Sequence, residues 1–374
     1  MGRNARTGRL YLEGFEPRKG GHCESSAMLN ALAYLGYGVD EADIAGGGGA
    51  PGFMFTNRGF PFVGGRNERM RENFLEAAGI RFGVEVPAAG DAGWEGVFNL
   101  LGRGLPVLLR VDMRYLPYLY GGRYGPAYMS FGWHVVCLHG VDFDSGEASV
   151  TDTARGGPCL VALRDLDRAR GSRTRAFPPR REYAWIEPRP EGWALDADAL
   201  ARASLAAVLG NYDAPSSWGS ERGGREGAGG PLAGLAGLAA FPEVLGSLRE
   251  SVRPQALGAA YAYMADSIER NGTGGSAFRA FFRDFLAARA ADCPDPRIRA
   301  ACAGLLPLAA AAAEAWSALA AEFAAASAAL AAAKGGASRD LAAETAARAT
   351  AGRAAALHEA ELALRDAVAA ATGR

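Results

Sequence analysis

Residues that favour helices dominate the second half of the chain, and this restricts the architectures open to it. From about residue 190 onward, apolar residues recur at helical spacing in segments such as DALARASLAAVLG, QALGAAYAYMADSIERNG and SAFRAFFRDFLAARAAD. Alanine, the strongest helix former, fills much of the remainder. These patterns predict an all-α domain over residues 191–374.

The first half mixes helical patterns with short apolar runs. The runs bounded by Gly, Asp and Pro, which predict short and largely antiparallel strands, are LPVLLRVD, WHVVCLHGVD, EASVTDT and CLVAL. Helices are predicted over ESSAMLNALAYLG, ERMRENFLEAAG and AGWEGVFNLLGRG, each ending near a glycine. A Pro-rich and Arg-rich connector, FPPRREYAWIEPRPEG, follows. We therefore expect an α+β domain over residues 1–190, with the boundary in the connector.

Composition excludes several classes of protein. The net charge of -1 provides no global field for nucleic acid or anionic lipid. The cysteines form no CxxC pair and are odd in number, so neither a disulfide framework nor a zinc site is predicted; they are Cys23, Cys137, Cys159, Cys293 and Cys302. The first residues lack the apolar run of a secretory signal. We expect a cytoplasmic protein with reduced thiols.

Two segments of the second half carry further expectations. The apolar stretch from about 303 to 333 is mostly alanine and contains Glu314 and Glu322, which argues for a water-soluble helix rather than a membrane span. Its small residues allow close helix packing, so a homo-oligomer is a possible assembly. The Gly-rich and Ser-rich segment 215–230 predicts a mobile loop that is either disordered or a lid.

Cys23 directly precedes a predicted helix, and a thiol at a helix N-terminus beside an imidazolium ionises readily. The chain offers four histidines: His22, His134, His139 and His358. His134 opens a predicted strand, and Asp152 ends the next one, where a carboxylate can orient the imidazole. This order predicts a catalytic triad in which Cys23 attacks an acyl carbon, His134 moves protons and Asp152 holds His134.

The competing interpretation is that a single cysteine is a small buried residue. We assign that role to the other four cysteines, because Cys137 lies inside an apolar strand and the rest lack suitable neighbours in the sequence. For Cys23, the strand positions of His134 and Asp152 favour the catalytic interpretation.

Four motifs resemble the papain-like acyltransferases typified by butirosin biosynthesis protein H: GHCESSAMLNALAYLG, RVDMRYLPY, GWHVVCLHGVDFDSGEASVTDT and RNGTGGSAFRAFFRDFL. The resemblance spans almost the whole chain. The resemblance implies a papain-like domain followed by a helical one. It also implies a cysteine enzyme that takes an acyl or aminoacyl group from an acyl carrier protein and passes it to an amine. The phosphopantetheine thioester would then be a substrate arm rather than a bound cofactor.

The pattern HVV…GVD…V.D is also similar to the peptidase domains of bacteriocin-exporting ABC transporters, which supports the fold but leaves the reaction open. Papain-like enzymes usually bind the oxyanion with a glutamine shortly before the cysteine. This chain has Pro17, Arg18 and Lys19 there. The remaining donors are the Cys23 backbone N–H and His22. His22 is alternatively an exposed loop residue.

Other motifs bear on ligands. Asp112 follows an apolar strand, so it either binds the acceptor ammonium near Tyr115 and Tyr118 or is an ordinary strand-end aspartate. AGGGGAPGF lacks a following GK[ST] and predicts a flexible turn beside the cleft, not a phosphate loop. DFDSGE lacks the later ligands of a calcium loop and predicts a hairpin turn. No metal is predicted.

A run of arginines follows the predicted strands: Arg164, Arg168, Arg170, Arg173, Arg175, Arg180 and Arg181. It either receives an acidic carrier protein or its phosphopantetheine phosphate, or is a solvated surface. The leading prediction for the chain is an acyltransferase of secondary metabolism. A cysteine hydrolase with the same triad, either a peptidase or a thioesterase, is the first alternative, and a non-catalytic helical scaffold is the second.

Overall fold

The structure, a computed structural model, describes residues 7–57, 61–153, 156–174, 177–214 and 232–373. Two compact units divide the chain. The first lies within residues 1–41 and 79–195, and the second within residues 42–78 and 196–374. The sequence predicts one boundary near residue 190 and two continuous domains. A break does fall there, but the structure corrects the division, because residues 42–78 belong to the second unit.

Residues 42–78 belong to the second unit because they pair and pack with its later elements. Strands β2 and β3 form an antiparallel hairpin, and the short strand β10 adds to β2. Helix α3 packs against α6, the first helix after the break. The bounds of these elements are α2 Glu41–Gly47, β2 Pro51–Thr56, β3 Phe62–Arg66, α3 Met70–Ala77, α6 Ala197–Asp213 and β10 Leu232–Ala233.

Glycines make this packing possible. A Cβ on Gly46 would lie 2.3 Å from the Cβ of Phe285, and one on Gly47 would lie 2.9 Å from a methyl carbon of Leu200. Only glycine permits such a close approach between a backbone and its neighbours. The run AGGGGAPGF ends α2, forms a turn at Gly48 and Gly49, and begins β2, so it contains the predicted turn, which is packed against Met70 and Ala207.

The first unit is built on an antiparallel sheet. Within the described residues its strands run in the order β4-β9-β5-β6-β7-β8, and β1 pairs with the far end of β6. All pairings are antiparallel, as predicted. The bounds are β1 Arg9–Tyr11, β4 Phe82–Glu85, β5 Val107–Val111, β6 His134–Asp142, β7 Glu147–Thr151, β8 Cys159–Ala162 and β9 Tyr183–Ile186.

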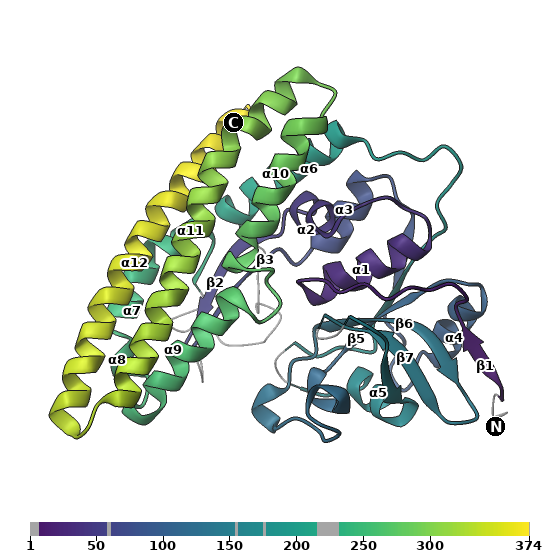
Figure 1. The fold of residues 1–374 in the computed structure, drawn as a ribbon, viewed down its shortest axis with the longest axis horizontal. Helices are drawn as coiled ribbons and strands as arrows, with labels where there is room; N and C mark the ends of the chain where they lie inside the picture. The colour runs from purple at the N-terminus through teal and green to yellow at the C-terminus, as the bar shows by residue number, and fades with distance from the viewer. Residues whose placement is uncertain (1–6, 58–60, 154–155, 175–176, 215–231, 374) are drawn as a thin grey trace. The chain divides into compact units, whose positions relative to one another are not determined.

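Every residue of β6 is buried, because helices cover both faces of the central strands. Val136 and Leu138 point into the core shared with α4 and α5, so the alternate residues Val135 and Cys137 face the other side. Helix α1 packs on β6 and β5 (Figure 1). The helical elements are α1 Cys23–Tyr34, α4 Trp94–Gly102, η1 Met113–Tyr115, η2 Pro117–Leu119, η3 Ala127–Met129 and α5 Leu163–Arg170.

Strands β5 to β8 confirm the four predicted runs, and DFDSGE forms the predicted turn between β6 and β7. Strand β9 corrects the sequence interpretation. Its residues YAWI lie in the segment predicted as a connector, yet they pair with β4 and β5 inside the sheet. A four-residue strand has too little periodicity to stand out beside prolines and arginines.

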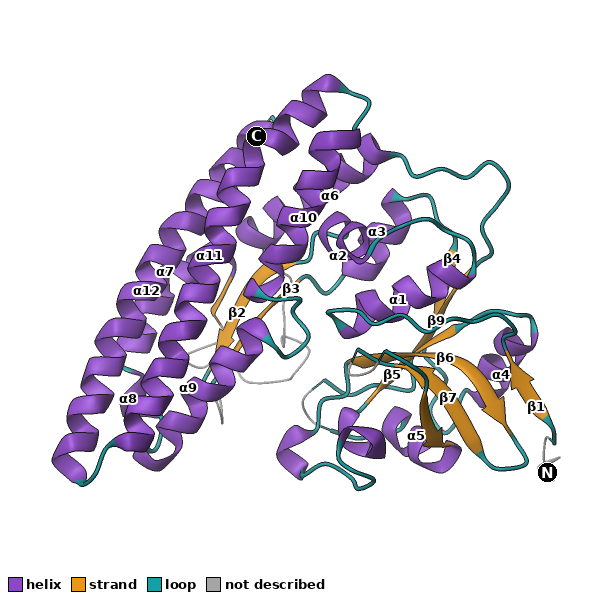
Figure 2. Cartoon of the chain, in the orientation of Figure 1, coloured by secondary structure: helices purple, strands orange, loops and turns teal. Residues whose placement is uncertain are grey.

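The second unit is dominated by helices, as predicted, although the small β2–β3–β10 sheet means that it is not all-α (Figure 2). The long helices α11 and α12 pack together, and α9 and α10 pack against α11. The bounds are α7 Gly234–Gly246, α8 Leu248–Ser251, α9 Pro254–Glu269, η4 Ser276–Phe278, α10 Arg279–Asp292, α11 Pro296–Ala332 and α12 Gly336–Ala371. The predicted loop at 215–230 lies outside the described residues.

A buried ion pair joins several elements of this unit. Arg279 of α10 donates from Nε to Oε1 of Glu361 of α12 at 2.7 Å, and both side chains are fully buried. Trp316 of α11 donates to the same oxygen at 2.6 Å, and Tyr212 of α6 donates to Oε2. Arg279 also donates to the carbonyl of Gly52 in β2. Such a pair is tolerated in a core because its hydrogen-bonding groups are matched.

Helix α11 is long and apolar enough to cross a membrane by length and composition. Within the unit, however, its buried side chains, including Trp316, Leu319 and Phe323, belong to the packed core. A core helix passes the same composition test as a membrane span, so the helix is weak evidence for one.

Candidate active site

Cys23 is the first residue of α1, one position before the predicted start, and so lies at a helix N-terminus, as predicted. His22 is the N-cap, with an extended backbone, and its Nδ1 accepts the backbone N–H of Ser25 at 3.3 Å. A capping side chain of this kind accepts one of the first-turn N–H groups that have no partner within the helix. The thiol of Cys23 is therefore held at the positive end of the helix dipole.

His134 and Asp152 meet at one end of two neighbouring strands. His134 begins β6, and Asp152 follows β7, while the register pairs Cys137 with Thr151. His134 Nε2 lies 2.8 Å from Asp152 Oδ2, and the two side chains are 10% and 1% exposed. Because an ionised carboxylate only accepts, the imidazole donates here from Nε2, which leaves Nδ1 for another partner.

The thiol of Cys23 is a further hydrogen-bond partner of His134. Burial alone raises the pKa of Cys23, but its interactions with His22 and His134 outweigh burial and hold the pKa well below its ordinary value. Burial also lowers the pKa of His134, yet Asp152 and then Cys23 raise it well above the usual value. The pair therefore favours thiolate and imidazolium together.

Asp152 has two further hydrogen-bond donors. Tyr118 Oη donates to Oδ2 at 2.8 Å, and Thr153 Oγ1 donates to Oδ1 at 3.1 Å. Burial raises the pKa of Asp152, but His134, Tyr118 and Thr153 outweigh it, so the pKa lies below its ordinary value. Sequence reasoning placed Tyr118 near a substrate amine and missed its contact with Asp152. The only available signal was its position in an aromatic segment that follows a strand.

His22 is buried, so the interpretation of it as an exposed loop residue is wrong. Its Nε2 lies 3.7 Å from the Sγ of Cys23. Glu41, at the start of α2, accepts the backbone N–H groups of Gly21 and His22 and the hydroxyl of Ser25. Sequence reasoning missed Glu41, because nothing in its local pattern connects it to the cysteine loop.

Arg18, in the segment before Cys23, makes backbone contacts with α1. The backbone N–H of Arg18 donates to Oδ1 of Asn30 at 2.7 Å, and the Asn30 amide donates back to the Arg18 carbonyl at 2.9 Å. Asn30 belongs to α1 and is buried. The segment before Cys23 is therefore held against the same helix that presents the thiol.

Asp112 is a structural strand-end aspartate. Its carboxylate is fully buried and accepts from the hydroxyls of Ser130 and Ser172 at 2.5 and 2.6 Å. It also accepts the backbone N–H groups of Phe131 and Arg114. These four donors use its oxygens, so the expectation that Asp112 binds an acceptor ammonium is corrected.

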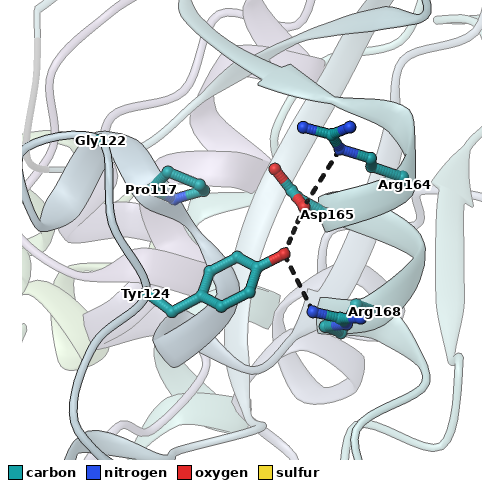
Figure 3. A pocket seen from close by; sticks show the side chains of 6 residues that line it. All are labelled: Pro117, Gly122, Tyr124, Arg164, Asp165 and Arg168. Atoms are coloured by element: carbon teal, nitrogen blue, oxygen red, sulfur yellow. Dashed lines mark hydrogen bonds and ion pairs between the residues drawn. The ribbon is translucent and has the colours of Figure 1, made fainter.

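Tyr115 does not join the cysteine site through any of its described contacts. Its ring lies edge-on to Tyr124, with the centroids 5.3 Å apart, and Arg114 and Arg168 lie over it. Tyr124 borders a cavity of about 480 Å³ that also involves Pro117, Gly122, Arg164, Asp165 and Arg168 (Figure 3). Tyr115 therefore supports one wall of this pocket.

The pocket is rich in positive charge. Tyr124 Oη donates to Asp165 at 2.5 Å and accepts from Arg168 at 3.2 Å. The side chain of Arg164 is 87% exposed and lies 3.8 Å from the same carboxylate. Arg164 thus lies beside the Asp165 carboxylate, whereas Arg168 is linked to it through the hydroxyl of Tyr124 (Figure 3).

The rest of the predicted arginine run is less uniform. Arg170 is fully buried over the ring of Trp94, so it is not part of a solvated surface. Arg181 donates to Asp167 at 2.6 Å. Arg175 lies outside the described residues. Packing of α5 against the sheet, rather than sequence proximity, separates these arginines.

The other four cysteines are buried, as expected for structural thiols. Burial raises the pKa of Cys137 far above its ordinary value, raises that of Cys293 to about 12 and raises that of Cys302 to about 11. Within the described residues, no group of His, Cys, Asp and Glu side chains could hold a metal ion.

The first unit thus defines an α+β protein in which a helix and an antiparallel sheet bring a cysteine, a histidine and an aspartate into contact. Residues 22–153 match the family described as butirosin biosynthesis protein H, N-terminal. Residues 164–366 match a domain of unknown function, DUF4872. The chain belongs to the family of proteins similar to butirosin biosynthesis protein H. No curated protein matched the sequence.

Membership of this family links the chain to natural-product biosynthesis and indicates an enzyme of such a pathway. The matched residues 22–153 contain Cys23, His134 and Asp152.

Proposed function

We propose that the protein is a papain-like acyltransferase that moves an acyl or aminoacyl group from a thioester to an amine. The observation that carries the proposal is the contact chain from Cys23 through His134 to Asp152, with Nε2 of His134 2.8 Å from Asp152. The order of a nucleophile on a helix and a base and carboxylate on neighbouring antiparallel strands supports the papain-like assignment. The five free thiols suit a reducing compartment, so we place the protein in the cytoplasm.

Acylation begins with the thiolate of Cys23. Sγ attacks the thioester carbonyl carbon, and the bond from that carbon to the donor sulfur breaks. The imidazolium of His134 gives its proton to the departing thiolate. The products are an acyl thioester on Cys23, a free donor thiol and a neutral His134. The backbone N–H of Cys23, at the start of α1, is our candidate donor to the oxyanion, because first-turn N–H groups have no partner within the helix.

Deacylation uses the same groups in reverse. The acceptor amine attacks the acyl carbon while neutral His134 removes one of its protons. The bond to Sγ then breaks, which releases the amide and restores thiolate and imidazolium. Asp152 keeps the imidazole oriented and stabilises its positive charge in both steps.

The arginine pocket is our candidate contact for the donor. Arg164 and Arg168 face a cavity of about 480 Å³ in the same unit as Cys23. Guanidinium groups bind phosphate and carboxylate strongly, so the pocket suits the phosphodiester of a phosphopantetheine arm or an acidic side chain of a carrier protein. Pro117, at its edge, precedes Tyr118, which contacts Asp152. The arm itself is a substrate in this proposal.

Intact-protein mass spectrometry tests the proposal. The protein and its Cys23→Ala variant are incubated with an acyl pantetheine thioester, and a panel of amines is added afterwards. We expect an adduct on the parent protein alone that one class of amine discharges faster than water does. Full transfer activity of Cys23→Ala would overturn the mechanism.

A cysteine hydrolase is the second candidate, because the same triad works with water as the second nucleophile. An adduct that water discharges as fast as every amine would support a thioesterase. No adduct with any thioester, together with cleavage of peptides, would support a peptidase. An unreactive Cys23 would favour a non-catalytic scaffold.

A further inference from the structure

A second imidazole lies against the thiol of Cys23. Nε2 of His22 is 3.7 Å from Sγ, and His22 is buried. The ring is held by the helix that it caps, because its Nδ1 accepts the backbone N–H of Ser25 at 3.3 Å. His22 reaches the sulfur from the chain before α1, whereas His134 reaches it from β6. The triad described above assigns no role to this second ring.

A hydroxyl and a carboxylate lie behind His22. Ser25 Oγ is 3.3 Å from Nδ1 of His22 and donates to Oε1 of Glu41 at 2.7 Å. Glu41 also accepts the backbone N–H of Gly21 at 2.8 Å and that of His22 at 3.0 Å. Because an ionised carboxylate only accepts, the hydroxyl hydrogen of Ser25 points to Glu41. Ser25 Oγ is then able to accept from Nδ1.

Two arrangements of the ring hydrogens direct an N–H to the sulfur. When Nδ1 accepts from the Ser25 backbone, the hydrogen of a neutral His22 is on Nε2. When His22 is protonated, Nδ1–H donates to Ser25 Oγ, and Nε2 still carries a hydrogen.

We propose that His22 is a positioning residue that donates from Nε2 to the Cys23 thiolate, and that Ser25 and Glu41 hold it in that orientation. The inference takes Cys23 as the nucleophile of the proposed function and adds a division of labour between two histidines. His134 transfers protons to and from substrates. His22 stays beside the sulfur, so the thiolate has a second donor both when it attacks the thioester and when it leaves the acyl carbon.

Several charged groups surround the sulfur and enter the test. His22 approaches from the chain before α1 and His134 from β6, with Asp152 behind His134 and Glu41 behind Ser25. Glu24, the next residue of α1, is buried. The quantity to measure is the stabilisation of the Cys23 thiolate that is lost when only the His22 ring is removed.

Alkylation of Cys23 by iodoacetamide at a series of pH values measures that part without acyl transfer, since only the thiolate reacts. Peptide mass spectrometry reads the modified site. The variant His22→Asn keeps a good N-cap residue but removes the ring. The matched control is His358→Asn on α12, in the other unit.

We expect the inflexion of the alkylation profile to rise by about one pH unit in His22→Asn, which lowers the rate on the acid side about tenfold. His358→Asn should match the parent protein. Ser25→Ala should shift the profile in the same direction by a smaller amount, and it carries the test if His22→Asn does not fold by circular dichroism.

An unchanged inflexion in a folded His22→Asn protein, with a raised one in His134→Asn, would overturn the proposal and leave the triad intact. The converse result is a raised inflexion in His22→Asn together with a parent protein that transfers no acyl group to any amine. That result would overturn the proposed transferase and retain the role of His22. The two failures are thus distinguishable.

Discussion

Tyr118 donates its hydroxyl hydrogen to Oδ2 of Asp152 at 2.8 Å, the same oxygen that His134 contacts from Nε2. One carboxylate oxygen therefore accepts hydrogen bonds from both the imidazole and the phenol. The phenol comes from the 3-10 helix η2, and the carboxylate follows β7. Tyr118 thereby contacts the same carboxylate that pairs with His134.

Replacing Tyr118 by Phe should lower kcat/KM about tenfold, because it removes one hydrogen bond to a charged group. The acid limb of the pH profile should also move to higher pH, since the Asp152 carboxylate loses a stabilising donor. Steady-state kinetics over a pH range check this. The control is Tyr124→Phe at the arginine pocket, which should leave the acid limb in place. An unchanged profile in Tyr118→Phe would exclude a role in positioning.

The pH dependence of catalysis should be broad and should narrow in Asp152→Asn. In the parent protein the pKa of Cys23 is lowered and that of His134 is raised, so the thiolate and imidazolium coexist between the two values. Removing the Asp152 charge lowers the pKa of His134 and, through it, raises that of Cys23. We expect each limb to move inward by roughly one pH unit.

Asp152→Asn should also lower the maximal rate about a hundredfold while partial activity remains, because the imidazole is present but less well oriented. Cys23→Ala and His134→Ala should each abolish transfer. The measurement is kcat/KM against pH for all four proteins. A parent-like profile in Asp152→Asn would show that Asp152 does not act on His134.

Charge in the arginine pocket should affect the donor and not the acceptor. Replacing Arg168 by Gln should raise KM for a carrier-linked thioester about tenfold, because it removes a guanidinium that can bind phosphate. KM for the amine should not change. Arg202→Gln on α6 serves as a surface control. Equal donor KM values in Arg168→Gln and the parent protein would remove the pocket from the donor site.

The buried pair in the second unit should be essential for its stability. Replacing Glu361 by Gln leaves the guanidinium of Arg279 buried without its counter-charge, so we expect a loss of about 3–5 kcal/mol in the free energy of unfolding. The double variant Arg279→Met with Glu361→Leu should recover part of this loss. Urea denaturation measures both. A single variant as stable as the parent would show that the pair contributes little.

Packing at the glycine run should make substitution there costly. Gly46→Ala would bring a Cβ to 2.3 Å from Phe285 and 2.9 Å from the carbonyl of Phe281, so we expect destabilisation of about 1–3 kcal/mol. The control is Gly304→Ala in α11, where nothing lies within 4 Å of the added Cβ. That change should stabilise the helix by about 0.4–1 kcal/mol. Thermal denaturation of both variants decides the comparison.

The local sequence patterns were sufficient to predict the central strands and the first helix of the first unit. Apolar runs bounded by turn residues predicted β5 to β8, because strand periodicity and turn chemistry are properties of short segments. The helix that begins at Cys23 followed from its spacing and from the glycine stop at Gly36. Since β6 and β7 are joined by a tight turn, their pairing and the meeting of His134 with Asp152 could also be expected.

Other features depend on contacts between residues far apart in the chain. Strand β9 and the place of residues 42–78 in the second unit have no local signal that outweighs nearby prolines and glycines. Asp112 shows the same limit, since a strand-end carboxylate is equally suited to solvent, to substrate or to the four donors that surround it here.

By itself, the sequence determined where α1 begins, which strands carry His134 and Asp152, and that the later residues form helices, because each depends on neighbours within a few positions. Only the tertiary structure decided that Glu41 and Ser25 support His22, that Tyr118 contacts Asp152 and that Arg279 pairs with Glu361. These contacts join separate elements, and their existence depends on how side chains pack once the whole unit has folded.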